Sequence, residues 1–140
     1  MPSTVLVADR PAGFIEDYRD FLASKGHKVF TAATLDEIEN LLRKNSFEVA
    51  FISSNLLHNM DLPFLRNLRR RFSDCKFVLI TPDFNAEIFL EAMHCSVFHE
   101  CLLAPLNLPL LENVIQSLTQ PVDEGTRIYI RPRNETLSKV

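Results

Sequence analysis

Short apolar runs alternate with amphipathic segments along most of the chain. The apolar runs have the length and composition of buried strands, whereas the segments between them repeat apolar residues at helical spacing, as at Phe14, Tyr18, Phe21 and Leu22. Five strands are predicted, over residues 5–8, 28–31, 47–52, 77–80 and 98–103. The pattern therefore predicts five strand–helix units.

Local signals mark the ends of several predicted helices. Gly26 is a good stop for the first helix. Thr34 and Glu37 have the spacing of a capping box at the start of the second helix. Asp61 is expected to cap the third helix, with Pro63 tolerated in its first turn. Two further helices are predicted, over residues 85–95 and, after Pro105, with Leu110, Leu111, Val114, Ile115 and Leu118 facing inward.

Alternation of hydrophobic strands with helices predicts an α/β fold with a parallel sheet covered on both faces. Because parallel crossovers are right-handed, few topologies remain for five such units. A flavodoxin-like, doubly wound, five-stranded sheet of order 2-1-3-4-5 fits best. In that order a site is expected between strands 1 and 3, at their C-terminal ends.

Length and tail composition predict one domain with an extension. We assign residues 1–120 to a single domain, because 140 residues are too few for two ordinary cores. Residues 121–140 read as a linker with a further strand over 126–132 and the start of a helix at Asn134. That strand belongs either to an interaction tail that packs on a neighbouring molecule or to the beginning of a following domain.

Composition narrows the functional classes. A net charge of −3 and a pI near 5.8 argue against general nucleic-acid binding. Three cysteines, without the spacing of a disulfide scaffold, indicate a reducing, cytoplasmic setting. No apolar run reaches the roughly 20 residues that a membrane span needs, and no signal peptide is evident at the N-terminus.

Four short segments resemble the signatures of response-regulator receiver domains. They are the strand and loop Val5–Pro11, the strand Phe47–Ser54, the strand end Leu79–Pro82 and the strand end Leu102–Pro105. The resemblance spans about residues 3–119. It implies the flavodoxin-like fold and a role in two-component signal transduction.

The resemblance also implies a phosphorylation pocket, whose positions this chain fills unusually. Active receivers carry two acids after the first strand, an aspartate after the third, a Ser or Thr after the fourth and a Lys before a Pro after the fifth. The corresponding residues here are Asp9, Arg10, Ser53 or Ser54, Thr81 and Ala104, with Pro105 retained. Of the three acids and the lysine that active receivers carry at these positions, this chain therefore retains only the acid at Asp9.

These replacements predict a pocket without phosphoryl chemistry. Mg²⁺ binding should be weak beside one carboxylate and one guanidinium, and a serine cannot form an acyl phosphate. We expect Arg10 to pair with Asp9 and fill the former metal site. Alternatives are a phosphoacceptor with unusual chemistry and an anion or nucleotide sensor built from Arg10, Ser53 and Thr81. We expect no metal, no cofactor and no enzymatic activity.

The fourth helix carries apolar residues over more of its circumference than one buried stripe requires. In receivers, the surface of the fourth helix, fifth strand and last helix is a common dimerisation or output face, and an aromatic residue beside it moves on phosphorylation. Cys101 stands at that aromatic position. We therefore expect a protein partner or a homodimer at this face. The candidate interface residues are Ile88, Phe89, Met93, Cys101 and Leu110.

Two other clusters invite a chemical interpretation. His94, Cys95, His99 and Cys101 are close in sequence, but their spacing is not that of a zinc site, so packing is favoured over metal binding. Arg66, Arg69, Arg70 and Arg71 could contact an acidic partner, although a solvated helix face is favoured.

Overall fold

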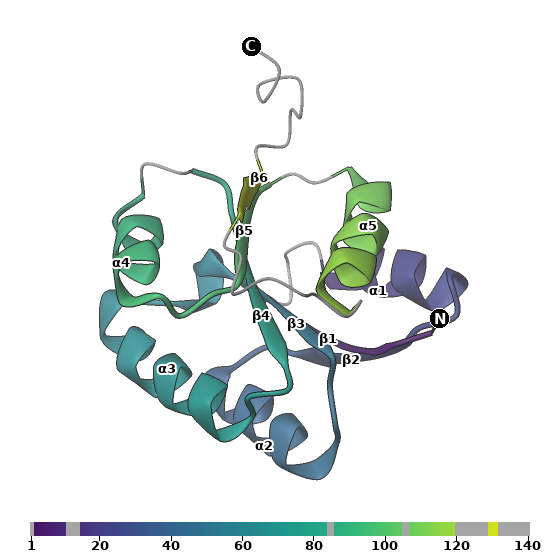
Figure 1. Ribbon diagram of the computed structural model, residues 1–140, viewed down its shortest axis with the longest axis horizontal. Coiled ribbons are helices and arrows are strands. Elements are labelled where there is room, and N and C mark those ends of the chain that lie inside the picture. Colours follow the sequence, from purple (N-terminus) through teal and green to yellow (C-terminus); the bar gives the residue numbers. More distant parts are fainter. Residues whose placement is uncertain (1, 11–14, 84–85, 105–106, 120–128, 132–140) are drawn as a thin grey trace.

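A parallel sheet with helices on both faces forms the body of the chain (Figure 1). The computed structural model describes residues 2–10, 15–83, 86–104, 107–119 and 129–131. Within these residues, no helix is long and apolar enough to cross a membrane. The elements in chain order are β1 Thr4–Ala8, α1 Ile15–Ser24, β2 Lys28–Ala32, α2 Leu35–Lys44, β3 Val49–Ser53, the 3₁₀ turns η1 Ser54–Leu56 and η2 Asn59–Asp61, α3 Leu62–Arg71, β4 Lys76–Thr81, α4 Glu87–Cys95, β5 Glu100–Leu103, α5 Leu108–Thr119 and β6 Tyr129–Arg131.

The strands have the order β2-β1-β3-β4-β5-β6, and every pair is parallel. The predicted order 2-1-3-4-5 is therefore confirmed. A sixth strand adds to it, because β6 pairs with β5 in the register Cys101↔Ile130. Its residues belong to the segment that the sequence placed in a tail or a following domain, and the structure adds them to this same sheet.

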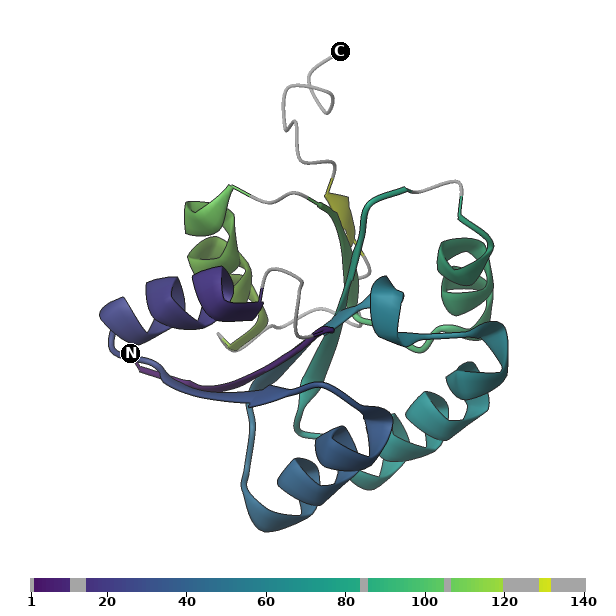
Figure 2. The same cartoon turned by 180° about the vertical axis from the view of Figure 1, so that it is seen from behind.

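The sheet separates two apolar cores. Helices α2, α3 and α4 cover one face, and α1 and α5 cover the other (Figures 1 and 2). Side chains of β1 alternate between them, since Leu6 packs in the first core and Val5 in the second. This alternation explains why central strands such as β3 are buried throughout.

Two of the predicted helix boundaries are confirmed by their hydrogen bonds. Gly26 has φ of 92°, a left-handed conformation that favours glycine, and its amide donates to the Ala23 carbonyl at 3.0 Å. The Thr34 hydroxyl accepts from the Glu37 amide at 3.1 Å. The Glu37 carboxylate accepts from Ala33 at 2.6 Å, one residue earlier than in a standard capping box.

Asp61 does not cap the third helix as the sequence predicted. Its carboxylate accepts from the His58 amide at 2.8 Å, and its own amide donates to the His58 carbonyl at 2.8 Å. These reciprocal bonds close η2 and leave the side chain unavailable to the amides of α3. Pro63 lies in the first turn of α3, as expected.

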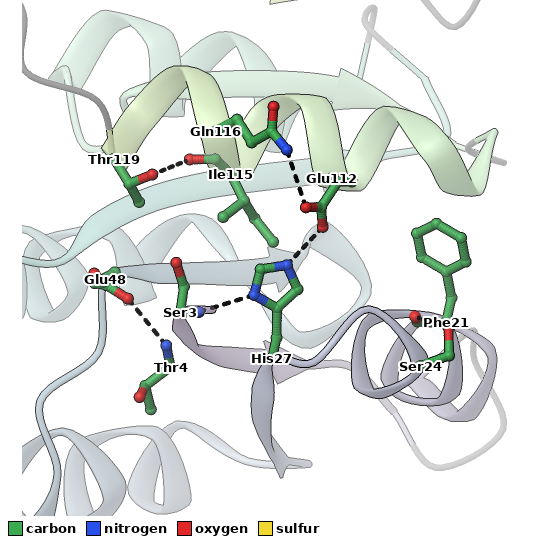
Figure 3. Close-up of polar contacts among 10 residues, drawn as sticks. All are labelled: Ser3, Thr4, Phe21, Ser24, His27, Glu48, Glu112, Ile115, Gln116 and Thr119. Carbon is green, nitrogen blue, oxygen red and sulfur yellow. Dashed lines mark hydrogen bonds and ion pairs between the residues drawn. The ribbon is translucent and has the colours of Figure 1, made fainter. Parts of the chain in front are cut away.

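A buried histidine joins the beginning of the sheet to the last helix (Figure 3). Nδ1 of His27 accepts from the Ser3 amide at 2.9 Å, and Nε2 lies 2.5 Å from Oε1 of Glu112 on α5. Gln116 donates to the second Glu112 oxygen at 3.2 Å. Because Nδ1 accepts, Nε2 carries the proton and donates to Glu112. The His27 side chain is 1% exposed, so this link lies inside the molecule.

The same contacts set the protonation of Glu112. Burial alone would raise the pKa of this carboxyl, but hydrogen bonds from His27 and Gln116 and the charge of Lys25 lower it overall. Glu112 therefore stays ionised at neutral pH and remains an acceptor for His27.

Replacing His27 with Ala should lower the free energy of unfolding by about 2 kcal/mol, because the Ser3 amide and a Glu112 oxygen lose their partner and a cavity opens. Gln116→Ala, at an exposed position, should change it by less than about 0.5 kcal/mol. Urea unfolding followed by circular dichroism measures both. Equal free energies of unfolding for His27→Ala and the unsubstituted chain would contradict a stabilising role for the link between His27 and Glu112.

Candidate functional site

The carboxyl ends of four neighbouring strands carry the pocket residues that the sequence singled out. Asp9 follows β1, Ser53 ends β3, Thr81 ends β4 and Ala104 follows β5. All four are buried, and Thr81 is fully enclosed at 0% exposure. Because these strands pair in parallel, their ends meet at one edge of the sheet.

Two hydroxyl groups contact each other across this edge. Ser54 Oγ donates to Thr81 Oγ1 at 3.2 Å. Thr81 Oγ1 in turn donates to the Asp83 carbonyl at 3.2 Å and accepts from the Asp83 amide at 3.3 Å. Ser53 makes a different hydrogen bond, since its Oγ accepts from the Asn55 amide at 3.1 Å and caps η1. Ser54, not Ser53, is therefore the hydroxyl beside Thr81.

Asp9 is held by backbone groups. The side chain is buried, and its Oδ1 accepts from the Arg10 amide at 2.7 Å. Ion pairs elsewhere in the described part of the chain include Arg19–Asp20, His27–Glu112 and Arg71–Glu39. Arg10 is exposed. The expectation that Arg10 pairs with Asp9 and fills the former metal site stays a prediction.

The residues of this edge do not fit Mg²⁺. A magnesium site in a protein needs near-octahedral oxygen ligands, usually with one or two carboxylates and several waters. Asp9 supplies a carboxylate with one oxygen already bonded to an amide, Ser54 and Thr81 supply hydroxyls that bond each other, and Ala104 supplies a methyl group. Across the described ranges, no three His, Cys, Asp or Glu side chains come together as metal ligands.

Three of the five candidate interface residues belong to the core. Phe89, Cys101 and Leu110 are 5%, 0% and 5% exposed, so they cannot present themselves to a partner. Ile88 and Met93 are half-buried and pack against the core that contains Phe89 and Cys101, whereas Leu110 lies in the other core. Leu90 is the exposed apolar residue of α4, at 56%. Apolar spacing alone does not single out Leu90, because apolar residues cover much of the circumference of α4.

The His and Cys residues near α4 make separate contacts. His99 Nδ1 accepts from the Phe77 amide at 3.0 Å, and Cys101 Sγ donates to Met93 Sδ at 3.3 Å. His94, at the other end of the group, is exposed. These contacts are packing contacts and hydrogen bonds to backbone groups, which is the interpretation that the sequence analysis favoured over metal binding.

Burial controls the protonation of the enclosed thiols and of His99. Burial raises the pKa of Cys75 and of Cys101 to about 12. Burial, with the charges of Arg69 and Lys76, lowers the pKa of His99 to about 4. At neutral pH both thiols are protonated and poor nucleophiles, and the histidine is neutral.

The arginines of α3 have two different roles. Arg66, Arg70 and Arg71 are exposed, as expected for a solvated face. Arg69 instead donates to the Ser96 carbonyl and places Nη2 3.2 Å from Nε2 of His99. Arg69 thus joins α3 to the segment between α4 and β5.

Comparisons with known proteins identify the fold. No protein-family model matches the sequence, and no curated protein matches it. The chain is similar to a CheY-like receiver domain from Methanospirillum hungatei JF-1, with 18% identity, a TM-score of 0.71 and coverage of 84% of this chain and 94% of that one. It is also similar to CheY4 of Vibrio cholerae, with 21% identity, a TM-score of 0.71 and coverage of 84% and 99%. A response regulator from Burkholderia multivorans has 19% identity, a TM-score of 0.69 and coverage of 89% and 100%. The chain therefore has the CheY-like, flavodoxin-type fold of receiver domains.

The half-buried side chain of His99 makes stability depend on pH. The pKa of His99 is about 4 in the folded chain, against an ordinary value of 6.5. The unfolded chain therefore binds more protons between these values, so the free energy of unfolding should fall as the pH drops from 6.5 toward 4. His99→Asn, which keeps an acceptor for the Phe77 amide, should fall less steeply. Urea unfolding across this pH range tests this, and parallel curves would refute it.

Proposed function

We propose that the chain is a signalling module of a two-component-type pathway that acts through protein–protein contacts and without accepting phosphate. The receiver fold supports the pathway, and the altered pocket supports independence from phosphate. The free state of Cys75, Cys95 and Cys101 fits a cytoplasmic setting.

The contact between Ser54 and Thr81 carries this proposal. Ser54 stands just after β3, where receivers carry the phosphoaccepting aspartate, and its Oγ donates to Thr81 Oγ1 at 3.2 Å. A serine hydroxyl cannot form an acyl phosphate, and its attack on phosphorus would need a base to take its proton. The proton of Ser54 is instead directed to another hydroxyl. We assign the acceptor position to Ser54 on this geometry.

The residues around the acceptor position also argue against phosphoryl transfer. Phosphoryl transfer depends on positive charge that neutralises the transferred oxygens, and removing one such group typically costs about 10²–10³ in rate. Ala104 stands at the lysine position and offers a methyl group. Arg10 stands at the second acid position and is exposed. The second metal-binding carboxylate and the lysine are thus both replaced.

The alternative functions have less support from the same contacts. An anion sensor would require Arg10, Ser53 and Thr81 to face one ligand. Ser53 is occupied as the cap of η1, and Thr81 is fully buried against Ser54. A phosphoacceptor with unusual chemistry would have to use the hydroxyl of Ser54.

The partner is expected at the side of α4. Of the face formed by α4, β5 and α5, Leu90 is exposed while Phe89, Cys101 and Leu110 are buried. The edge of β5 is paired with β6. The contact surface is therefore centred on α4, whether the partner is another protein or a second copy.

Incubation with acetyl phosphate and Mg²⁺, followed by intact-mass spectrometry, tests the proposal. The unsubstituted chain should keep its mass, because Ser54 cannot form an acyl phosphate and the pocket lacks the compensating charges. A stoichiometric gain of one phosphoryl group would overturn the proposal.

A variant that restores the receiver residues provides the positive control. Arg10→Asp, Ser54→Asp and Ala104→Lys together supply the second acid, the acceptor carboxylate and the lysine. This triple variant should gain a phosphoryl group under the same conditions. The pair without Ser54→Asp should stay unmodified, which would locate the defect at the acceptor.

A further inference from the structure

Strand β2 leaves one edge of the sheet open. In the described part of the chain it has β1 on one side and no strand on the other. The Lys28 amide and the Ala32 carbonyl bond the chain at the two ends of β1, at 2.9 and 3.1 Å. Because the direction of backbone groups alternates along a parallel strand, Val29 and Thr31 direct their amides and carbonyls to the open side.

A hollow of about 520 Å³ lies at this edge, near the carboxyl end of β2. Its lining comes from α1, β2 and α2, and includes Ile15, Thr31 and Leu41. Since α1 and α2 pack on opposite faces of the sheet, a hollow that both helices line lies beyond the edge of β2 (Figure 1). Its volume is within the range of ligand sites, about 300–1,000 Å³.

The walls of the hollow suit an extended polypeptide. Successive side chains of a strand point to opposite faces, and each wall has an apolar side chain, Ile15 on α1 and Leu41 on α2. Thr31 supplies an outward amide and carbonyl, the groups that an added strand bonds. The neighbouring Ala32 and Ala33 have small side chains. The hollow therefore offers backbone hydrogen bonds together with apolar contacts on both faces of one added strand.

Acids outnumber bases in the lining of the hollow. Glu16 contributes a carboxylate from α1, and Glu37 contributes one from α2. The Glu37 carboxylate is held in place, because its Oε1 accepts from the Ala33 amide at 2.6 Å. The guanidinium of Arg19 is the basic group of the lining, and it pairs with Asp20 at 3.2 Å. The lining therefore favours a cationic occupant.

The charges of the surrounding turns have the same bias. The first turns of α1 and α2 also contain Asp17 and Asp36, both exposed. Arg43 donates to the side-chain oxygen of Asn40, a lining residue, at 3.1 Å. The exposed bases of these elements and of the turn after α1 belong toward the other end of β2: Lys25, Lys28, Arg43 and Lys44. A basic segment is therefore favoured over an acidic one at the carboxyl end of β2.

We propose that this open edge binds an extended segment of a partner protein that carries Lys or Arg beside apolar residues. The segment adds to β2 as a further strand, with backbone bonds to Thr31 and apolar contacts to Ile15 and Leu41. Its cations pair with Glu16 and Glu37. The site goes beyond the proposed function, because it uses none of the phosphorylation-pocket residues and lies at the opposite end of the sheet from β5.

The test uses the full chain and an acetylated, amidated octapeptide with the repeat Val-Val-Arg-Arg, which has apolar and basic side chains on both faces when extended. Isothermal titration calorimetry should show saturable binding. Hydrogen exchange followed by ¹H–¹⁵N spectra should slow at the Val29 and Thr31 amides, because an added strand gives them acceptors. The same peptide with Glu in place of Arg should bind at least about tenfold more weakly.

Two changes test the backbone contacts separately from charge. An octapeptide with an N-methyl group on every amide keeps its side chains but cannot donate, so its affinity should fall at least about tenfold. Thr31→Pro removes the outward amide of β2 and leaves the side that faces β1 unchanged, so the variant should fold and bind at least about tenfold more weakly. If circular dichroism shows that Thr31→Pro is unfolded, the N-methylated peptide decides the same point alone.

Matched variants separate the site from general attraction. Glu16→Gln with Glu37→Gln should weaken binding by about fivefold or more, and the glutamine at position 37 keeps an acceptor for the Ala33 amide. Glu87→Gln with Glu91→Gln makes the same charge change at exposed positions of α4. This control should alter binding by less than about twofold.

Several results would refute the assignment. They are absence of saturable binding, equal binding of the Glu or N-methylated peptide, unchanged exchange at Val29 and Thr31, and equal losses in the two pairs of charge variants. Free arginine that binds as tightly as the octapeptide would assign the hollow to a small molecule instead. A dimer of the free chain that Thr31→Pro dissociates, measured by light scattering, would assign the edge to a second copy.

Discussion

The parallel register of β1, β3, β4 and β5 determines which side chains of this chain can act together. It brings residues far apart in sequence, Asp9, Ser54, Thr81 and Ala104, to one edge of the sheet. That edge is where parallel α/β proteins place their chemistry. The consequences for function depend on what those four positions contain, because the backbone that presents them has the fold of the receiver domains that it resembles.

Hydrogen bonds within the chain engage three of these four residues. Ser54 donates to Thr81, Thr81 is satisfied further by Asp83, and Asp9 accepts from the backbone of its neighbour. Such an edge is stable without a cation, because its buried polar groups have partners inside the chain. It also fixes the loop that leads to η2.

Sequence reasoning reached the elements and their order because the signals for them are local or general. Gly26 and Thr34 marked the ends of two predicted helices, and the right-handedness of parallel crossovers limited the possible strand orders. It failed where a competing hydrogen bond or tertiary burial decides the outcome. Asp61 was a plausible helix cap, but the nearby His58 amide captured its carboxylate. Apolar spacing on α4 could not tell that Phe89 is covered while Leu90 is not. Residues His27 and Glu112, 85 positions apart, gave no sequence signal of their contact.

A magnesium titration tests the loss of the pocket's chemistry most directly. ¹H–¹⁵N spectra of the full chain, recorded with rising Mg²⁺ into the millimolar range, report on the amides of Asp9, Ser54 and Thr81. One carboxylate beside paired hydroxyls should leave these amides without a saturable shift, while the variant restored at Arg10, Ser54 and Ala104 should show one. A saturable Mg²⁺-dependent shift of these amides in the unsubstituted chain would contradict the proposed loss of magnesium binding.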